Sequence, residues 1–409
     1  MESLRFIHCA DLHLDRPFHG LRHLPPQLAE RIRESTFASF RRIVDAAVKE
    51  KVDFMIIAGD LFDGEFRSLR AQARFRAEME RLGEAEIKVF AVHGNHDPVG
   101  GDWASLSWPD NVHIFGTHVE RIPFLRNGEP AANLYGFSYR DRAVLENMVS
   151  FYEKEDRAPY HIGILHGQEQ SSGGEHAAYA PFTVAQLLDK AFDYWALGHV
   201  HLRQILHENP YVVYPGNIQG LTAKETGEKG CMLVEMTGRD TGIHFIRTSD
   251  LDWLDCEISI SGLQTFDQLL KQCERHLEEQ RTNSGGLAVL RFIGAGPMHG
   301  AVHDEAFMED LFGALTDGEE HRYDFVWPVK YRSETVPDWD RNQLKSENHF
   351  IGDLLRLIDE EDHEEAFAPL LENRKARQYA ESIVSEQEEI VREAENLLLT
   401  RLLGNGGSQ

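Results

Sequence analysis

The stretch Lys88-Val89-Phe90-Ala91-Val92-His93-Gly94-Asn95-His96-Asp97 contains the most informative pattern of the chain. Its first half is an apolar run typical of a buried strand, and it stops at a glycine followed by an amide, an imidazole and a carboxylate. A strand needs none of these groups for packing, and burying them without partners costs several kcal/mol. Polar groups at the carboxyl ends of strands line the ligand crevice of α/β proteins. The stretch therefore predicts a functional site at a strand end.

Four other apolar stretches end in the same way. They are Leu4–Ala10 before Asp11-Leu12-His13, Val52–Ala58 before Gly59-Asp60, His161–Leu165 before His166, and Phe192–Leu197 before Gly198-His199-Val200-His201. Alternate residues of an extended chain point to the same side, so Asp11 and His13 are expected to share a face, as are His199 and His201. Gly59, Gly94 and Gly198 permit tight turns that direct the following side chains towards one point.

The side chains at these strand ends are those that bind metal ions. Three carboxylate or amide groups and four imidazoles make up the set: Asp11, Asp60, Asn95, His13, His166, His199 and His201. His161 is left out because it begins its strand, whereas His166 ends it. Seven donors are too many for one ion and suit two, and a set without thiolates favours Mn²⁺, Fe²⁺ or Zn²⁺. Two ions about 3.5–4 Å apart clamp a phosphoryl group, so the set predicts phosphate-ester hydrolysis.

The chain of 409 residues is acidic, with a formal net charge of −26. This charge argues against a protein that coats nucleic acid by bulk electrostatics. The first hundred residues are nearly balanced, with 15 basic and 16 acidic side chains. Any phosphate-binding surface is therefore expected to be local and N-terminal. The arginine-rich helix predicted at 67–81 is one candidate DNA contact, and a solvated helix face is the alternative.

Neither a membrane span nor a disulfide framework is expected. No window holds eighteen apolar residues, and the N-terminus lacks a signal-peptide pattern. The four cysteines have no CxxC spacing: Cys9, Cys231, Cys256 and Cys273. This spacing indicates neither a disulfide framework nor a structural zinc site. A cytoplasmic protein is expected.

The order of the predicted elements suggests three parts. Helical periodicity is clear from about Pro25 to Val48, and helices alternate with strands in the first half of the chain. From about residue 200 to Ile258 mostly strands follow one another, which is not the pattern of a plain doubly wound sheet. We expect a first domain over 1–258, a small α+β domain over 259–340 and a helical tail over 341–409.

Taken together, these motifs resemble the calcineurin-like metallophosphoesterase superfamily. The matching motifs are Asp11-x-His13, Gly59-Asp60, Gly94-Asn95-His96-Asp97, His166 and Gly198-His199-x-His201. Within that superfamily, three features are similar to the SbcD/Mre-type DNA repair nucleases: 58–63, 214–219 and the additional C-terminal domain. The segment 215–219 together with 225–230 is most similar to the bacterial YhaO branch.

The resemblance implies a role for each residue of the predicted site. One metal would be held by Asp11, His13, Asp60 and His201, and the second by Asp60, Asn95, His166 and His199, with Asp60 bridging the two. His96 would not be a ligand, and would stabilise the transition state or protonate the leaving oxygen. Asp97 would orient His96 or the loop that carries it.

The resemblance also implies a fold, an activity and partners. The α/β fold would be two packed mixed β-sheets flanked by helices, followed by an α+β capping domain and a helical C-terminal tail. The activity would be that of a Mn²⁺-dependent 3′–5′ DNA exonuclease, the nuclease subunit of a DNA repair complex. The chain would form a homodimer through its N-terminal helices, and the tail after Phe350 would bind an ABC-type coiled-coil ATPase.

Two other functions stay open. The same dimetal site would serve a phosphomonoesterase or a cyclic-nucleotide phosphodiesterase, and the chain would otherwise be a scaffold that docks the ATPase. No predicted ligand is missing, which disfavours the scaffold. Protein phosphatases of the superfamily carry an arginine where Gly64 stands and a glutamate where Asp97 stands, so that branch is disfavoured. Some relatives place a phosphate-contacting histidine where Asp63 stands, and that contact does not transfer.

Overall fold

The computed structural model describes residues 3–18, 20–21, 24–64, 68–100, 106–155, 158–170, 179–360 and 387–404. The contacts divide the chain into two compact units. The first consists of Met1–Leu254, Arg281–Leu287 and Gly318–Val329, and the second of Asp255–Gln280, Ala288–Asp317 and Lys330–Gln409. The division into domains 1–258, 259–340 and 341–409 stays a prediction, and the stretch 361–386 of the predicted tail lies outside the described residues.

The first sheet of the first unit carries three of the five strand ends. Its order is β12 (Asp240–Arg247), β11 (Gly230–Thr237), β1 (Leu4–Cys9), β2 (Phe54–Ala58), β3 (Lys88–Val92) and β4 (Val112–Ile114). The strands β1 to β4 run parallel to one another, whereas β11 pairs with β1 and β12 in antiparallel fashion. The carboxyl ends of β1, β2 and β3 therefore lie at the same edge.

The second sheet carries the other two strand ends. Its order is β5 (Glu120–Arg126), β6 (Glu129–Gly136), β7 (His161–His166), β8 (Tyr194–Gly198), β10 (Tyr211–Tyr214) and β9 (Gln204–Glu208). The strands β6, β7, β8 and β10 are parallel, and the edge strands β5 and β9 are antiparallel to their neighbours. Both sheets are thus mixed.

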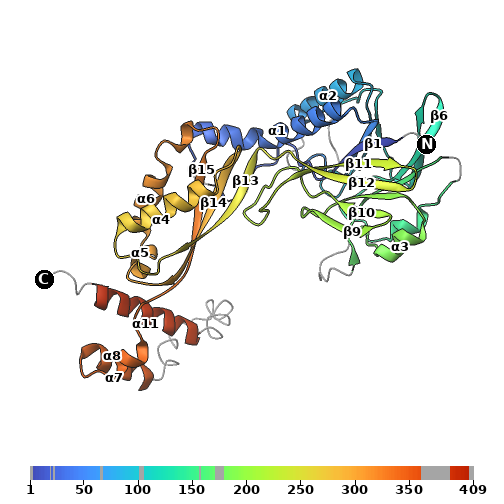
Figure 1. Cartoon of the computed structure of the whole chain (residues 1–409). Coiled ribbons are helices and arrows are strands. Elements are labelled where there is room, and N and C mark those ends of the chain that lie inside the picture. The colour runs from blue at the N-terminus through green and yellow to red at the C-terminus, as the bar shows by residue number, and fades with distance from the viewer. Residues whose placement is uncertain are drawn as a thin grey trace. The chain divides into compact units, whose positions relative to one another are not determined.

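The two sheets pack face to face between helices (Figure 1). One core lies between the sheets and includes Phe54, Ile56 and Ile162. A second core lies under the helices α1 (Pro26–Glu50) and α2 (Leu69–Glu84), and a third contacts α3 (Val184–Asp189) and the 3₁₀ turn Met148–Phe151. The β2 strand is buried on both faces, which explains its uninterrupted apolar sequence. The predicted pair of mixed sheets flanked by helices is confirmed.

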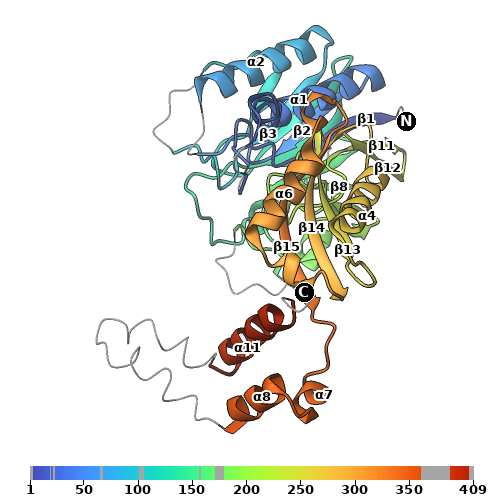
Figure 2. The same cartoon turned by 90° about the vertical axis from the view of Figure 1, so that its left-hand side faces the viewer.

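A smaller sheet and the remaining helices follow. The third sheet has the order β13 (Leu251–Ser259), β14 (Gly285–Ala295) and β15 (Val326–Val336). The accompanying helices are α4 (Phe266–Glu279), α5 (His299–Val302), α6 (Glu305–Thr316) and the 3₁₀ turn Glu319–His321. Figure 2 shows α7 (Arg341–Ser346) and α8 (Phe350–Glu360) beside α11 (Gln387–Gly404). Arg341 joins these three helices through ion pairs with Asp359 and Glu395.

One buried histidine of the core predicts acid sensitivity. His8 donates to the Leu197 carbonyl over 3.1 Å and accepts from the Tyr194 hydroxyl over 3.0 Å. Burial lowers the pKa of His8 from 6.5 to about 3. Below pH 6.5 His8 is therefore protonated in the unfolded chain, whereas in the folded chain it stays neutral down to about pH 3. This contribution to the free energy of unfolding is present above pH 6.5 and falls by about 1.4 kcal/mol per pH unit as acid is added.

We expect His8→Gln to remove this part of the pH dependence. Urea denaturation of the EDTA-treated protein between pH 7 and pH 5 measures the slope in both proteins. The exposed His244→Gln serves as the matched control, and its slope is expected to equal that of the wild type. Equal slopes for His8→Gln and the wild type would contradict the prediction.

Candidate metal centre

The five strand ends meet at one place in the first unit. The residues that follow β1 and β2 continue to pair beyond the strands, since the Asp11 N–H donates to the Gly59 carbonyl and the His13 N–H to the Asp60 carbonyl, each over 3.0 Å. Across the two sheets, the His199 N–H donates to the Asp11 carboxylate over 3.1 Å. The loops after β1, β2 and β8 are therefore held together by hydrogen bonds from backbone N–H groups, to carbonyls between the first two loops and to the Asp11 carboxylate from the third.

Four of the predicted ligands have backbone conformations that L-residues rarely adopt. The φ angles are +52° for Asp11, +42° for His13, +50° for Asp60 and +100° for His199. Each such residue costs on the order of 1–3 kcal/mol and persists only where the surrounding structure enforces it. Their concentration at the strand ends indicates that the fold directs these side chains at the expense of stability.

Two glycines leave the space that the site needs. A Cβ atom at Gly59 would lie 2.1 Å from His166 Nδ1, and one at Gly94 would lie 2.3 Å from Asp60 Oδ1 and 2.6 Å from His166 Nε2. Gly59 also has a φ of +97°, which favours glycine. Both glycines are therefore required for the close approach of His166 and Asp60.

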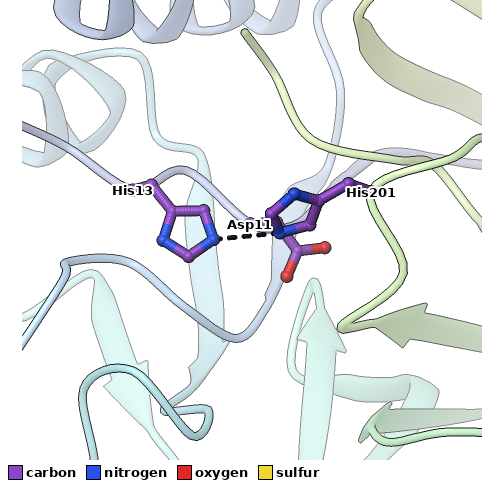
Figure 3. A group of neighbouring side chains, drawn as sticks. All are labelled: Asp11, His13 and His201. Atoms are coloured by element: carbon purple, nitrogen blue, oxygen red, sulfur yellow. Dashed lines mark hydrogen bonds between the residues drawn. The ribbon is translucent and has the colours of Figure 1, made fainter. Parts of the chain in front are cut away.

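The first cluster consists of Asp11, His13 and His201 (Figure 3), whose donor atoms all lie within 4.8 Å of one another. His13 Nε2 and His201 Nε2 face each other at 3.1 Å. The Nδ1–H of His201 donates to Glu225, so the Nε2 of a neutral His201 carries a lone pair. His13 Nδ1 is buried and has no hydrogen-bond partner among the described residues. Two imidazoles thus point their Nε2 atoms at one spot.

The second cluster surrounds His166. Its Nδ1–H donates to the Ala58 carbonyl over 3.0 Å, which leaves a lone pair on Nε2. That Nε2 lies 2.9 Å from Asn95 Oδ1 and 3.5 Å from Asp60 Oδ2. His199 Nδ1 lies 3.0 Å from the same Asn95 oxygen. Electron-pair donors therefore face one another here, an arrangement that a cation stabilises.

The buried carboxylates would be stabilised in their charged forms by a cation. Burial raises the pKa of Asp60 to about 7, and the charge of Asp97 adds to the rise. Burial and the charge of Asp60 raise the pKa of Asp11 well above its ordinary value. A divalent cation between them would favour the charged forms and reverse these shifts.

The imidazoles are already in the form that binds metal. Burial lowers the pKa of His166 to about 4 and that of His199 to about 3, and it lowers the pKa of His13 well below its ordinary value. All three are therefore neutral near pH 7, as metal ligands must be. His13 Nε2 and His201 Nε2 lie 3.1 Å apart, so both would bind a single cation placed between them. The residues present fit a pair of divalent ions.

His96 stands at the edge of the two clusters. Its backbone N–H donates to Asp60 over 2.9 Å, and its ring packs edge-on against the ring of His13 at 4.9 Å between centroids. Its Nδ1 lies 3.3 Å from Asp63, which also pairs with Arg16 at 3.2 Å. The hydrogen bond to Asp63 raises the pKa of His96, which favours a protonated ring. Asp63, noted in the sequence only as a departure from relatives, is the partner of His96.

Asp97 holds the loop. Its carboxylate accepts from the backbone N–H groups of Gly94 and Leu61, over 2.8 and 3.0 Å, and bonds His93 over 2.9 Å. Of the two roles expected for Asp97, its hydrogen bonds favour the fixing of the loop over contact with His96.

Glu225 is a residue that the sequence reading did not assign to the site. Its Oε1 accepts from His201 Nδ1 over 2.6 Å, and its Oε2 accepts from the Leu221 N–H over the same distance. Lys229 donates to the His201 backbone carbonyl over 2.9 Å, so hydrogen bonds fix both the ring and the backbone of His201. Although burial opposes its charge, the bonds from His201 and Leu221 lower the pKa of Glu225 to about 2. A carboxylate behind a metal-binding imidazole fixes the tautomer and orientation of the ring.

We expect Glu225→Gln to weaken Mn²⁺ binding by about 10- to 100-fold, because an amide fixes the tautomer and orientation of His201 less firmly. Isothermal titration calorimetry of the metal-free protein measures the affinity. The exposed Glu228→Gln is the control from the same segment and is expected to bind Mn²⁺ as the wild type does. Unchanged affinity in Glu225→Gln would show that the bond to His201 has no effect on the metal site.

The arginines of α2 are paired with carboxylates. Arg70 and Arg74 both bond Glu34, Arg76 lies 3.6 Å from Glu80, and Arg81 bonds Asp45 over 2.6 Å. Arg67 lies outside the described residues. The pairing favours a solvated helix face over a DNA contact for the described part of this helix.

None of the helices that the structure describes is long and apolar enough to cross a membrane.

Comparisons with known proteins found two matching family models and a solved structure. A model of the calcineurin-like phosphoesterase family matches residues 4–203, and a model of the middle domain of metallophosphoesterase YhaO matches 253–336. A dimetal phosphatase from Danio rerio has a TM-score of 0.34 and 14% identity, with 60% of this chain and 99% of that chain covered.

One of three sequence relatives covers nearly the whole chain, and the other two cover about half of it. The Mre11 double-strand break repair protein of Sulfurisphaera tokodaii is 26% identical, over 58% of this chain and 61% of its own. The mre-11 protein of Caenorhabditis elegans is 25% identical, over 49% of this chain and 36% of its own. The uncharacterized metallophosphoesterase YhaO of Bacillus subtilis is 39% identical over 98% of both chains. The chain therefore belongs to the calcineurin-like metallophosphoesterases, metal-dependent phosphoester hydrolases with a two-metal site.

Proposed function

We propose that the chain is a two-metal DNA exonuclease that hydrolyses phosphodiesters from 3′ ends, as the nuclease subunit of a DNA repair complex. The observation that carries the proposal is the meeting of two donor clusters beside His96, which has its own carboxylate partner. The similarity to Mre11 repair proteins over about half of the chain supports DNA as the substrate.

Each predicted site residue has a place in this proposal. Asp11, His13, Asp60 and His201 would hold one ion, and Asp60, Asn95, His166 and His199 the other. Bound there, two divalent ions would supply a nucleophile at neutral pH and neutralise charge on the phosphoryl group. The mixed oxygen and imidazole donors suit Mn²⁺. Asp97, through the loop bonds described above, keeps Asn95 and His96 in position.

His96 would supply the proton that the reaction needs. A sugar alkoxide is a poor leaving group, and protonation by a positioned imidazole removes that difficulty. Asp63 bonds Nδ1, so Nε2 is the nitrogen left to donate to the leaving oxygen. The side chain of His96 is 35% exposed and is thus accessible to substrate from solvent.

Partners would supply DNA affinity that this acidic chain lacks. We propose that it dimerises through its N-terminal helices and that the C-terminal tail binds an ABC-type coiled-coil ATPase. Of the described tail residues, Phe350 and Leu357 of α8 and Leu397, Leu398 and Leu402 of α11 are exposed apolar side chains. Because the net charge is −26, much of the DNA affinity of the complex would come from the ATPase.

The test compares DNA with small phosphate esters. Purified protein is incubated with 3′- and 5′-labelled duplexes, and in parallel with p-nitrophenyl phosphate and bis(p-nitrophenyl) phosphate, in Mn²⁺ or in EDTA. We expect stepwise shortening from 3′ ends in Mn²⁺, no product in EDTA, and faster turnover of the diester than of the monoester. Removal of metal abolishes the reaction because the buried carboxylates and neutral imidazoles have no other means to activate water.

Two results would contradict the proposal. Activity on the monoester without any on DNA would assign the site to a phosphomonoesterase. Hydrolysis of cyclic nucleotides in preference to DNA would assign it to a cyclic-nucleotide phosphodiesterase.

A further inference from the structure

A cavity of about 780 Å³ lies beside the metal centre and takes no part in the chemistry described so far. Its apolar wall consists of Pro17, Phe18, Leu21, Leu24 and Ile32, from the loop after β1 and the start of α1. Cavities of this size hold small organic ligands. We call it the loop pocket.

The loop pocket is connected to His96 through short contacts. Two of its lining residues, Asp15 and Gly64, are the chain neighbours of Arg16 and Asp63. Arg16 and Asp63 pair at 3.2 Å, and Asp63 lies 3.3 Å from His96 Nδ1. A molecule whose phosphate is at His96 therefore has the loop pocket next to it.

The lining of the loop pocket suits a flat aromatic ring. The ring of Phe18 stacks on Trp253, with centroids 6.2 Å apart and planes 27° apart. Trp253 therefore supports one face of the Phe18 ring. Every nucleobase has a π face that stacks on such a ring. Arg33 and Arg70 also line the pocket, but their charges are paired with Glu30 and Glu34. The apolar wall and the ring of Phe18 therefore carry the argument for a base.

We propose that the loop pocket binds the base of the nucleotide whose phosphate is cleaved. This inference rests on the proposed function, because it specifies the substrate of that same site. A base paired within a duplex is stacked between its neighbours and cannot enter a pocket without being extruded. The substrate is then a single-stranded or frayed DNA end, and the terminal base is held apart from the duplex while its phosphate is hydrolysed.

The kinetic test uses two diesters with the same leaving group. Thymidine 5′-monophosphate p-nitrophenyl ester carries a nucleoside, whereas methyl p-nitrophenyl phosphate carries only a methyl group beside the leaving group. We expect the wild type to prefer the thymidine ester in kcat/KM by about tenfold or more, the effect of one stacked base. Phe18→Leu keeps an apolar side chain against Trp253 but removes the ring, and is expected to lose this preference. Phe18→Tyr is expected to retain it, and Phe151→Leu, at an exposed phenylalanine, serves as control.

A binding measurement keeps the inference independent of turnover. Calorimetry in Mn²⁺ compares thymidine 5′-monophosphate with inorganic phosphate, and we expect a preference of about tenfold for the nucleotide that Phe18→Leu abolishes. Equal affinities of the wild type for the nucleotide and for inorganic phosphate would show that the loop pocket does not bind the base. A preference that is unchanged in Phe18→Leu would show the same. If the protein binds the nucleotide in this way but degrades no DNA, the pocket stands and the exonuclease proposal fails. If the protein degrades DNA but shows no preference for the nucleotide over inorganic phosphate, the exonuclease proposal stands and the pocket proposal fails.

Discussion

Asp60→Asn is expected to reduce Mn²⁺-dependent hydrolysis by at least about 10³-fold, more than the loss of a residue that only supports a ligand. Asp60 is the one predicted ligand shared by both ions. Its carboxylate lies 3.5 Å from His166 Nε2 and 3.7 Å from His13 Nε2. An amide in its place offers one neutral oxygen where two charged oxygens stood.

The same substitution is expected to have opposite effects on metal binding and on the stability of the metal-free protein. Calorimetry should show fewer than two Mn²⁺ bound per chain, and the thermal stabilisation that Mn²⁺ gives the wild type should largely disappear. In EDTA at pH 8, however, the variant should melt at a higher temperature than the wild type. Burial raises the pKa of Asp60 to about 7, so above that pH the folded state carries a charge that it disfavours.

Asp110→Asn makes the same chemical change at an exposed residue away from the site. It is expected to alter neither Mn²⁺ binding nor the melting temperature in EDTA. If Asp60→Asn binds two Mn²⁺ with the affinity of the wild type, Asp60 does not bridge the ions. If the variant is unfolded in EDTA, its loss of activity says nothing about the metal centre, and the melting curve identifies that case.

The strand ends were predictable because local sequence controls them. An apolar run that stops at Gly59, Gly94 or Gly198 marks the end of a buried strand, and parallel strands present their ends at one edge. The edge strands β5 and β9 escaped prediction for the same physical reason. Pro123 interrupts the alternation of β5, and β9 is a five-residue strand without alternation that pairs with its neighbour β10 at the edge of the sheet.

Contacts between distant segments were beyond the sequence. Glu225 bonds His201 across 24 residues, and no spacing rule joins an acidic residue of a loop to a histidine that follows a strand. Asp63 lies 33 residues before His96. The positive φ angles of Asp11 and Asp60 are uncommon for any residue but glycine, so local propensity does not predict the conformation that the site requires.

His96→Asn is expected to lower kcat on DNA by about 10²- to 10⁴-fold, the usual loss when a general acid is removed. The loss should be much smaller on bis(p-nitrophenyl) phosphate, because p-nitrophenolate leaves without a proton whereas a sugar alkoxide does not. The number and affinity of bound Mn²⁺ should stay those of the wild type, since His96 is proposed to act on the leaving oxygen and not on the metal. Exposed His118→Asn is the matched control.

The pattern of losses separates the possible roles of this imidazole. Equal losses on both substrates would mean that His96 stabilises charge on the phosphoryl group and donates no proton to the leaving oxygen. Loss of bound Mn²⁺ would make it a ligand. Asp63→Asn should repeat the dependence on leaving group more weakly, because the ring of His96 remains while its partner at Nδ1 loses its charge. A reaction limited by alkoxide departure thus requires both members of the pair, and a reaction with a good leaving group requires neither.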